Sequence, residues 1–290
     1  MTSNNEVEVV LITGANTGLG YETVRSLCQS SSQEYTILLG GRDLDKAEAA
    51  TKQVQEEFPD SPSTVRPIQV DIEHDESIAQ AFEQVSNEYG RVDVLINNAG
   101  KSKSKSADTH TPAPPCIQID QQYYAGKMSM RKAWNKSWDV NTTGTHIMTY
   151  TFAPLLLKSK STKNPRLLFI TSGTSTLGEA EQAKLWIDQS PPKGWPKEPM
   201  RLGVGAYRSS KTGMNMMMRE WTRILKEDGV KVWCISPGML VTGLGGNPEM
   251  IKKMGGLDAA IGADFVRDVV EGGRDQDVGK VIRRDNVQPW

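Results

Sequence analysis

The sequence predicts an α/β fold, with one doubly wound parallel sheet of about seven strands flanked by helices. Two observations predict it. Short, nearly continuous apolar runs recur along the chain, and stretches with apolar residues at helical spacing lie between them. Such runs are typical of strands buried on both faces, and their alternation with helices favours parallel strands joined by right-handed crossovers. Because neither a tandem repeat nor a long linker interrupts the alternation, we expect residues 1–290 to form one domain.

Six apolar runs mark strands in chain order, and a seventh is expected near the end of the chain. Helices are expected at Tyr21–Leu27, Asp43–Phe58 and Asp75–Tyr89, where charged residues separate apolar ones at helical spacing. The carboxyl ends of parallel strands meet at one edge of the sheet, and open α/β sheets bind their ligands there. The expected strands are Val7–Ile12, Thr36–Leu39, Val65–Val70, Val92–Ile96, Leu167–Ile170, Val230–Ile235 and Val278–Ile282.

Three irregular stretches each follow an expected strand and should therefore lie near that edge. Lys101–Pro115 is rich in lysine, serine and proline, and Leu177–Val204 contains four prolines and two tryptophans, so it cannot be one plain helix. Gly243–Gly256 is rich in glycine around a short helical piece at Pro248–Lys253. Loops of this length often form lids or pocket walls.

Insertions are expected near residues 101–136 and 177–204, and their roles stay open at this point. Trp186 and Trp195 can either wall an apolar or aromatic substrate or pack their insertion against the rest of the domain. Lys101–Pro115 fits a plain surface loop as well as a functional one. Its lysines lack the interleaved aromatic residues that nucleic-acid binding would require.

Charge and composition argue against several classes of protein. The formal net charge is −1, so no overall field favours nucleic acid or an anionic membrane. No apolar run reaches the roughly 18 residues of a membrane span, and Met1–Glu8 lacks the features of a signal peptide. Cys28, Cys116 and Cys234 are odd in number and far apart, and the three histidines have no ligand spacing. We expect a cytoplasmic protein with reduced thiols and no metal.

A glycine-rich turn directly follows the first expected strand and precedes the first expected helix. It reads Thr13-Gly14-Ala15-Asn16-Thr17-Gly18-Leu19-Gly20. Glycine lets the backbone turn tightly and approach a pyrophosphate, while a helix N-terminus offers free N–H groups and a positive dipole end. Three glycines alone are weak evidence, but their placement between a strand and a helix strongly indicates a dinucleotide site.

The spacing T-G-x-x-x-G-x-G resembles the short-chain dehydrogenase/reductase family and differs from the G-x-G-x-x-G fingerprint. Further family motifs follow in order: Asn97-Asn98-Ala99-Gly100, the N-x-x-G that starts at Asn141, and Pro237-Gly238. The resemblance covers roughly residues 7–245 and implies a Rossmann-type fold that binds a nicotinamide cofactor. The residues that it implies at the cofactor are Gly14, Asn16, Thr17, Gly18, Leu19, Gly20, Arg42, Asp71, Ile72, Asn98, Ala99, Gly100, Tyr207, Lys211, Pro237, Gly238 and Thr242.

The end of the second strand bears on the choice of nicotinamide cofactor. NAD-dependent enzymes generally place a carboxylate there for the ribose 2′-hydroxyl, whereas this strand ends in Gly40-Gly41-Arg42. A guanidinium can bind a 2′-phosphate with its planar fork, and a carboxylate would repel it. Asp43 weakens this argument, although it also fits as the N-cap of the next helix. Arg42 could instead pair with Asp43 or Asp45. We expect NADP(H).

The resemblance implies a catalytic tetrad of Asn141, Ser172, Tyr207 and Lys211. Tyr207 and Lys211 are four residues apart, so on a helix they share one face. A neighbouring ammonium favours the phenolate of a tyrosine that otherwise titrates near about pH 10. In the family, the lysine also holds the nicotinamide ribose, the serine bonds the substrate oxygen, and the asparagine kinks its helix and anchors a water. The gap of 35 residues from Ser172 to Tyr207 is wider than is usual in the family.

We therefore expect an NADP(H)-dependent oxidoreductase that transfers hydride between nicotinamide and a carbonyl or alcohol, with Tyr207 as general acid/base. Two alternatives stay open: reduction of an imine or activated alkene, and a non-catalytic NADP-binding protein. The family commonly pairs the Tyr207 helix and the preceding long helix across a two-fold axis, which implies a homodimer or homotetramer. Methionines on the Tyr207 helix then pack the core or the subunit contact, namely Met214, Met216, Met217 and Met218.

Overall fold

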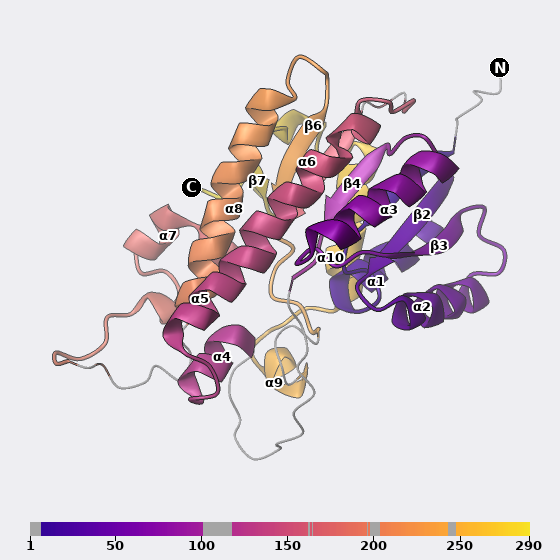
Figure 1. Cartoon of the computed structure of the whole chain (residues 1–290). Helices are drawn as coiled ribbons and strands as arrows, with labels where there is room; N and C mark the ends of the chain where they lie inside the picture. The colour runs from indigo at the N-terminus through magenta and orange to yellow at the C-terminus, as the bar shows by residue number, and fades with distance from the viewer. Residues whose placement is uncertain are drawn as a thin grey trace.

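The computed structural model describes residues 7–100, 118–161, 163, 165–195, 197, 204–242 and 248–290. Its centre is a seven-stranded sheet in the order β3-β2-β1-β4-β5-β6-β7, in which all neighbouring strands are parallel (Figure 1). The predicted doubly wound α/β fold is confirmed. The strands are β1 (Glu8–Ile12), β2 (Tyr35–Gly41), β3 (Thr64–Gln69), β4 (Val94–Asn97), β5 (Arg166–Ile170), β6 (Lys231–Ile235) and β7 (Val281–Ile282).

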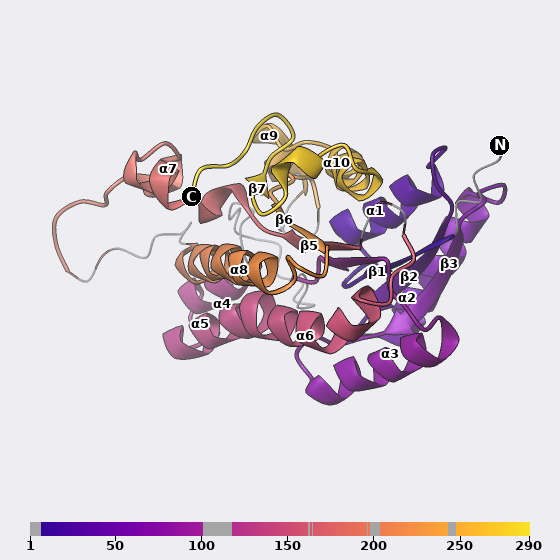
Figure 2. The ribbon, with the colours of Figure 1, turned by 90° about the horizontal axis from the view of Figure 1, so that it is seen from above.

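Helices cover both faces of the sheet (Figure 2). One apolar cluster lies between the sheet and α3, α6 and α8, and a second lies between the sheet and α1, α2 and α10. The helices are α1 (Gly18–Cys28), α2 (Leu44–Glu57), α3 (Asp75–Glu88), α4 (Gln118–Tyr124), α5 (Met130–Trp138), α6 (Thr145–Leu156), α7 (Leu177–Glu181), α8 (Gly205–Ile224), α9 (Pro248–Lys253) and α10 (Ala259–Glu271).

β1 shows why the strands read as continuous apolar runs. Val9 and Leu11 point into the cluster beneath α3, α6 and α8, whereas Val10 and Ile12 point into the opposite cluster. Side chains alternate between the two faces of a strand, and here helices bury both faces. Every side chain of the strand must therefore be apolar or have a hydrogen-bond partner.

Most predicted bounds are within one or two residues of those observed, and two elements, α1 and β7, begin three residues from the predicted position. α1 begins at Gly18 and not at Tyr21, because the Tyr21 N–H already bonds the Thr17 carbonyl, so the glycine turn and the helix overlap. The last strand, β7, covers only Val281–Ile282 and does not begin at Val278 as predicted. Gly279 has a φ of +78°, and this turn delays the extended segment.

The described part of the range in which an insertion is expected, residues 118–136, contains α4 and most of α5. α5, a π-helical segment (Asp139–Gly144) and α6 follow one another without a break, so residues 130–136 begin a long helix. Within α5 only Ala133 and Ser137 are buried, which explains why its apolar repeat is too weak to read. Lys101–Pro115 lies outside the described residues.

The two other irregular stretches agree with what the sequence predicts for them. Leu177–Val204 is broken into α7 and a 3-10 turn at Trp186–Asp188, and α9 has the bounds predicted for the short helical piece. Cys28 and Cys234 are buried free thiols. Across the described ranges, no helix is long and apolar enough to cross a membrane.

Candidate active site

The turn after β1 brings peptide groups to the carboxyl edge of the sheet. Gly14 and Gly18 have φ values of +63° and +60°, a region that favours glycine. A Cβ on Gly14 would lie 2.9 Å from the Ala99 Cα, and one on Gly20 would strike the Asn98 side chain. The glycines therefore leave a cradle of backbone at the start of α1, which suits the pyrophosphate of a dinucleotide.

Asn98 and Thr13 lock this turn to the end of β4. The Asn98 side-chain amide donates to the carbonyls of Thr13 (2.9 Å) and Gly14 (3.1 Å). In return, the Thr13 hydroxyl accepts from the backbone N–H groups of Asn98 (3.1 Å) and Ala99 (3.0 Å). Gly100 follows at the same edge, where a Cβ added to it would lie 3.8 Å from the Asn141 Oδ1. Thr13 is thus a structural member of the site that the sequence analysis did not single out.

The remaining residues of the turn and the chain after β6 complete the cradle. Asn16 is half-buried, and the exposed Thr17 is the N-cap of α1. Leu19 packs against the cluster under α1 and α10. A Cβ on Gly18 would lie 3.6 Å from the Thr242 Cβ, so the loop after β6 reaches this turn. Within that loop Pro237 is buried and Gly238 has a φ of +98°.

The second strand ends where the sequence analysis placed the cofactor-selecting residues. Arg42 is exposed, and among the described residues its guanidinium has no carboxylate partner. Asp43 instead caps α2, accepting from the Lys46 N–H at 3.3 Å and pairing with the Lys46 ammonium. Arg42 therefore does not pair with Asp43 or Asp45, which was the alternative prediction for it.

The end of β3 lies beside the long helix. The Asp71 carboxylate accepts from the Glu73 N–H at 3.1 Å, which shapes the turn into α3. Ile72 is buried, and its carbonyl oxygen lies so close to Gly144 that any Cβ there would collide with it. The glycine of the N-x-x-G motif is therefore required by the approach of two backbones.

Asn141 lies in the π-helical segment between α5 and α6, and it is buried. Its side-chain amide donates to the Ser210 hydroxyl at 3.0 Å, and that hydroxyl donates to the Tyr207 carbonyl at 2.8 Å. The Thr142 hydroxyl adds a bond to the Ser210 carbonyl at 3.0 Å. A π-turn widens a helix locally and is frequent at functional sites. Here it turns Asn141 toward the first turns of α8.

Tyr207 and Lys211 lie on successive turns of α8. The Lys211 Nζ is 6.0 Å from the centre of the Tyr207 ring and donates to the Ile170 carbonyl, at the end of β5, at 2.7 Å. Burial lowers the pKa of Lys211 to about 8, because the ammonium loses its hydration, while Cys234 opposes this shift. The lysine thus bridges the tyrosine and the strand that leads to Ser172.

Ser172 stands two residues beyond the β5 carbonyl that Lys211 binds. Its hydroxyl accepts from the Thr174 N–H at 3.2 Å and contacts the Thr174 hydroxyl at 3.0 Å. In the described part of the chain it does not bond Asn141, Tyr207 or Lys211. The fold brings all four predicted residues to one edge of the sheet, and the Lys211 bond to the Ile170 carbonyl connects the β5 backbone, which leads on to Ser172, with the α8 residues.

Asp120 on α4 is a residue of this site that the sequence analysis missed. It is buried, and its carboxylate accepts from the backbone N–H groups of Ala206 (3.3 Å) and Tyr207 (3.2 Å). Burial raises the pKa of Asp120, and the two N–H bonds oppose this shift. A signal existed, because Val204, the N-cap of α8, has no side-chain oxygen for the first helical N–H groups.

An apolar cluster surrounds the tyrosine. Ile119 and Tyr123 of α4, Met128, Ile187 and Val204 pack with Tyr207 and Ala133. Trp195 is 88% exposed, so it does not pack the insertion against the rest of the domain. The Trp186 side chain lies outside the described residues. Over the described positions, acidic, histidine and cysteine side chains form no group that could hold a metal.

Sequence comparison agrees with this geometry. The family model described as short chain dehydrogenase matches residues 8–184 and 199–250. The chain is 45% identical to the short-chain dehydrogenase/reductase eupG of Phoma sp., covering 97% of each chain. It is 42% identical to the short-chain dehydrogenase/reductase tropE of Talaromyces stipitatus, covering 99% of each. The fold and these matches define the class as oxidoreductases, and the chain belongs to the short-chain dehydrogenase family.

Solved structures share the fold at low sequence identity. NADPH-bound carbonyl reductase from chicken fatty liver superposes with a TM-score of 0.71 at 20% identity, covering 98% of this chain and 100% of that one. L-sorbose reductase from Gluconobacter frateurii, complexed with NADPH and L-sorbose, gives a TM-score of 0.67 at 16% identity, covering 98% and 97%.

Proposed function

We propose that this protein transfers hydride between NADP(H) and a carbonyl or alcohol, with Tyr207 as general acid/base. The observation that carries the proposal is the position of Lys211, whose buried ammonium lies beside the Tyr207 ring and at the end of β5. The similar proteins of known structure named as carbonyl reductase and L-sorbose reductase, both with NADPH, support it.

The residues present fit a nicotinamide dinucleotide, because the cradle at Gly14 and Gly20 is kept open by the absence of Cβ atoms. The peptide groups at the start of α1 would hold the pyrophosphate, and Lys211 would hold the nicotinamide ribose. Asp71, Ile72 and the Asn98–Gly100 backbone would face the rest of the cofactor. The bound cofactor supplies or accepts the hydride.

The residues of the protein move the proton. In the direction of reduction, the Tyr207 hydroxyl donates its proton to the substrate oxygen while the Ser172 hydroxyl stabilises the developing charge. The Lys211 ammonium stabilises the phenolate that results. Asn141, through Ser210, holds the Tyr207 backbone and would anchor the water that returns a proton. Oxidation of an alcohol uses the same groups in reverse.

The proposal is tested with Tyr207→Phe, assayed by loss of NADPH absorbance with a panel of ketones and quinones. We expect turnover to fall by about 10²- to 10⁴-fold, the usual contribution of a general acid/base, with NADPH affinity nearly unchanged. Tyr89→Phe, at the end of α3, is the matched control. Near-normal turnover of Tyr207→Phe would refute the assignment. NADPH binding by the wild-type protein without turnover of any substrate would favour a non-catalytic NADP-binding protein.

The preference for NADP(H) rests on Arg42. Its guanidinium is exposed at the end of β2, while Asp43 is occupied with Lys46. Arg42→Ser should therefore weaken NADPH binding by roughly tenfold and leave NADH binding unchanged, because only the 2′-phosphate loses its charged partner. Equal affinity of the wild-type protein for the two cofactors would contradict this preference.

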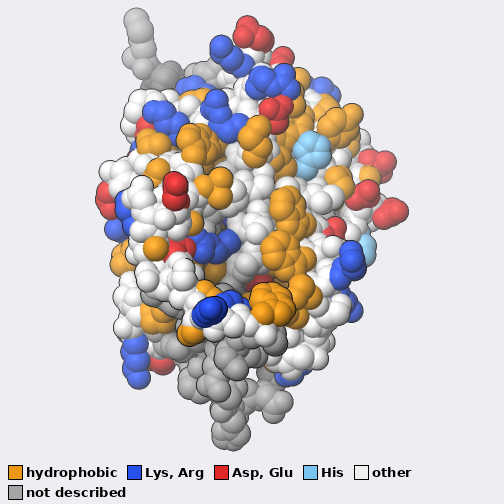
Figure 3. Space-filling view, turned by 90° about the vertical axis from the view of Figure 1, so that its left-hand side faces the viewer, with side chains coloured by type: hydrophobic (Ala, Val, Ile, Leu, Met, Phe, Trp, Pro, Cys, Tyr) orange, Lys and Arg blue, Asp and Glu red, His pale blue; other side chains and the backbone are white. Residues whose placement is uncertain are grey.

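We also propose that the protein forms a homodimer or homotetramer through α5, α6 and α8. Met214 and Met218 are buried in the core, whereas Met216 is 61% exposed. Figure 3 shows hydrophobic side chains gathered in a stripe along one face of the molecule. Light scattering should give a mass of two or four chains, and a monomer at all concentrations would contradict the proposal. Exposed apolar residues on these helices include Trp134, Trp138, Tyr150, Met216 and Ile224.

A further inference from the structure

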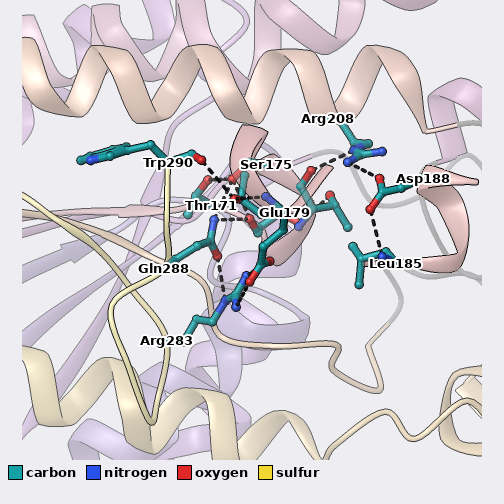
Figure 4. Close-up of polar contacts among 12 residues, drawn as sticks. Thr171, Ser175, Glu179, Leu185, Asp188, Arg208, Arg283, Gln288 and Trp290 are labelled. Carbon is teal, nitrogen blue, oxygen red and sulfur yellow. Dashed lines mark hydrogen bonds and ion pairs between the residues drawn. The ribbon is translucent and has the colours of Figure 1, made fainter. Parts of the chain in front are cut away.

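The C-terminal segment of residues 283–290 returns to the end of β5 (Figure 4). Val287 forms an antiparallel bridge with Ile282, and the Gln288 N–H donates to the Val281 carbonyl at 2.9 Å. The Trp290 carbonyl then accepts from the Gly178 N–H at 2.6 Å. The C-terminal segment therefore lies against α7, which follows Ser172 in the sequence.

Gln288 makes the contact nearest to Ser172. It is buried, and its side-chain nitrogen donates to the Ser172 carbonyl at 3.2 Å and to the Ser175 hydroxyl at 3.3 Å. Its side-chain oxygen accepts from the Arg283 Nε at 3.1 Å. Because Arg283 can only donate, it fixes which end of the amide faces Ser172.

Arg283 is itself held by Glu179 on α7. The two guanidinium nitrogens donate to the two carboxylate oxygens at 2.9 and 2.5 Å, a bidentate pair. The Arg283 hydrogen bond lowers the pKa of Glu179, so the pair stays charged at neutral pH. The hydrogen bonds from Glu179 through Arg283 to Gln288 thus connect the two ends of the segment that follows β5, Ser172 and Glu179.

The opposite side of this segment is attached to the Tyr207 helix. The Ser175 hydroxyl accepts from the Asn215 side-chain amide at 2.9 Å, and the Thr171 hydroxyl donates to the Asn215 oxygen at 2.7 Å. The Ser175 carbonyl accepts from the Thr212 hydroxyl at 2.9 Å. The backbone around Ser172 is therefore held between α8 and the C-terminal segment.

We propose that Gln288 is a positioning residue for the reaction: it holds the Ser172 carbonyl, and through it the direction in which the Ser172 hydroxyl faces the substrate. This inference rests on the proposed function, in which that hydroxyl stabilises charge on the substrate oxygen. Gln288 touches neither the cradle at Gly14 nor Lys211, so its effect falls on the chemical step and not on the cofactor.

The test compares Gln288→Leu with Gln276→Leu. Gln276 is an exposed glutamine whose amide donates to the Gly273 carbonyl at 3.5 Å. In the full chain, Gln288→Leu should lower kcat about tenfold, the effect of losing one or two hydrogen bonds at a positioned group. The KM for substrate and the affinity for NADPH should match the control. Loss of kcat at constant KM marks an interaction made in the transition state.

A second measurement, independent of activity, is amide hydrogen exchange with mass spectrometry. The peptide over residues 172–179 should exchange about tenfold faster in Gln288→Leu than in Gln276→Leu, while the peptide over residues 13–20 is unchanged. If Gln288→Leu does not fold, Gln288→Glu replaces it, because that variant keeps the size and the acceptor for Arg283 but lacks the donor for Ser172.

Unchanged exchange over residues 172–179, or unchanged kcat despite faster exchange, overturns the inference and leaves the proposed function intact. Equal losses of NADPH affinity and of protection in both peptides also overturn it, because they indicate general destabilisation. A wild-type protein that binds NADPH but turns over no substrate defeats the proposed function instead, and the exchange measurement still decides whether Gln288 holds the Ser172 segment.

Discussion

The two ends of the site are built from different material. The cradle after β1 is formed by backbone peptide groups, and the four residues that its motif fixes lie within eight positions of sequence, at Thr13, Gly14, Gly18 and Gly20. The other end, the proposed reacting end, holds Asn141, Ser172, Tyr207 and Lys211, which come from three separate elements. Buried side chains connect Asn141 and Lys211 with their neighbours, and the β5 backbone leads from the Lys211 contact to Ser172. The first end depends on what glycine lacks, and the second on side chains with defined partners. Substitutions should therefore damage the two ends in different ways.

Lys211→Met should cause the largest loss, and it tests whether the reacting end trades stability for chemistry. We expect turnover to fall by about a hundredfold or more, because the phenolate loses its cation. At neutral pH the free energy of unfolding should rise by at most about 3 kcal/mol, since the buried ammonium is removed. The Ile170 carbonyl loses its donor, which reduces this gain. Urea denaturation and steady-state kinetics measure both effects, with Lys226→Met just beyond α8 as control.

The pH dependence sharpens this prediction. The pKa of Lys211 falls from 10.5 to about 8 on folding, so between these values the unfolded chain binds more protons than the folded one. Lys211 should therefore contribute stability that rises as the pH increases from about 8 toward 10, while the buried thiols of Cys28 and Cys234, whose pKa burial raises, contribute in the opposite direction. Because both proteins keep these thiols, the stability of Lys211→Met relative to the wild type should fall over this pH range. A variant with the same slope as the wild type, or with lower stability at neutral pH, would contradict this account.

Gly14→Ala tests the cradle, where one methyl group should suffice to do harm. The φ of +63° and the approach of Ala99 together should cost about 2–3 kcal/mol of stability and weaken NADPH binding. Gly126→Ala is a matched control, because Gly126 has a φ of +70° but no atom within 4 Å of its Cβ position. It should cost only the conformational part, about 1 kcal/mol. Equal losses in the two variants, by thermal melting, would show that Ala99 makes no contribution.

Asp120→Asn should have the smallest effect, and it bears on how the reacting end is tuned. The substitution removes a buried negative charge bonded to the Tyr207 N–H while retaining one acceptor. With that charge gone, ionisation beside it becomes easier, and the midpoint of the pH profile of kcat/KM should move to lower pH by roughly one unit or less. Asp60→Asn, at an exposed turn, is the control. A midpoint identical to that of the control would exclude an electrostatic role for Asp120.

Contiguous motifs could be predicted with little error. Gly14 lies in the turn after β1, and Gly18 and Gly20 lie in the first turn of α1, because their spacing permits both the turn and the first helical bonds. The strands follow from apolar runs, since both faces of the sheet are covered. Errors arose where the local pattern was weak: α5 buries only two residues, and β7 has only two.

The partners of the site residues could not be predicted, because each lies far away in sequence. Asp120 bonds Tyr207 across 87 positions, and Gln288 bonds Ser172 across 116. A single carboxylate or amide has no periodicity, and its role depends on which backbone group the fold places within hydrogen-bond reach. One indication was available: Val204, the N-cap of α8, has no side-chain oxygen, so the first backbone N–H groups of that helix need an acceptor from elsewhere.

The amino-acid order alone determined the class of fold, the glycine turn and the identity of the tyrosine–lysine pair, because these depend on residues within a turn or two of one another. The tertiary structure decided what surrounds that pair: the π-turn that aims Asn141, the buried carboxylate of Asp120, and the C-terminal segment against Ser172. Such contacts form only when separate elements pack, since desolvation and hydrogen bonding act on atoms brought together in space.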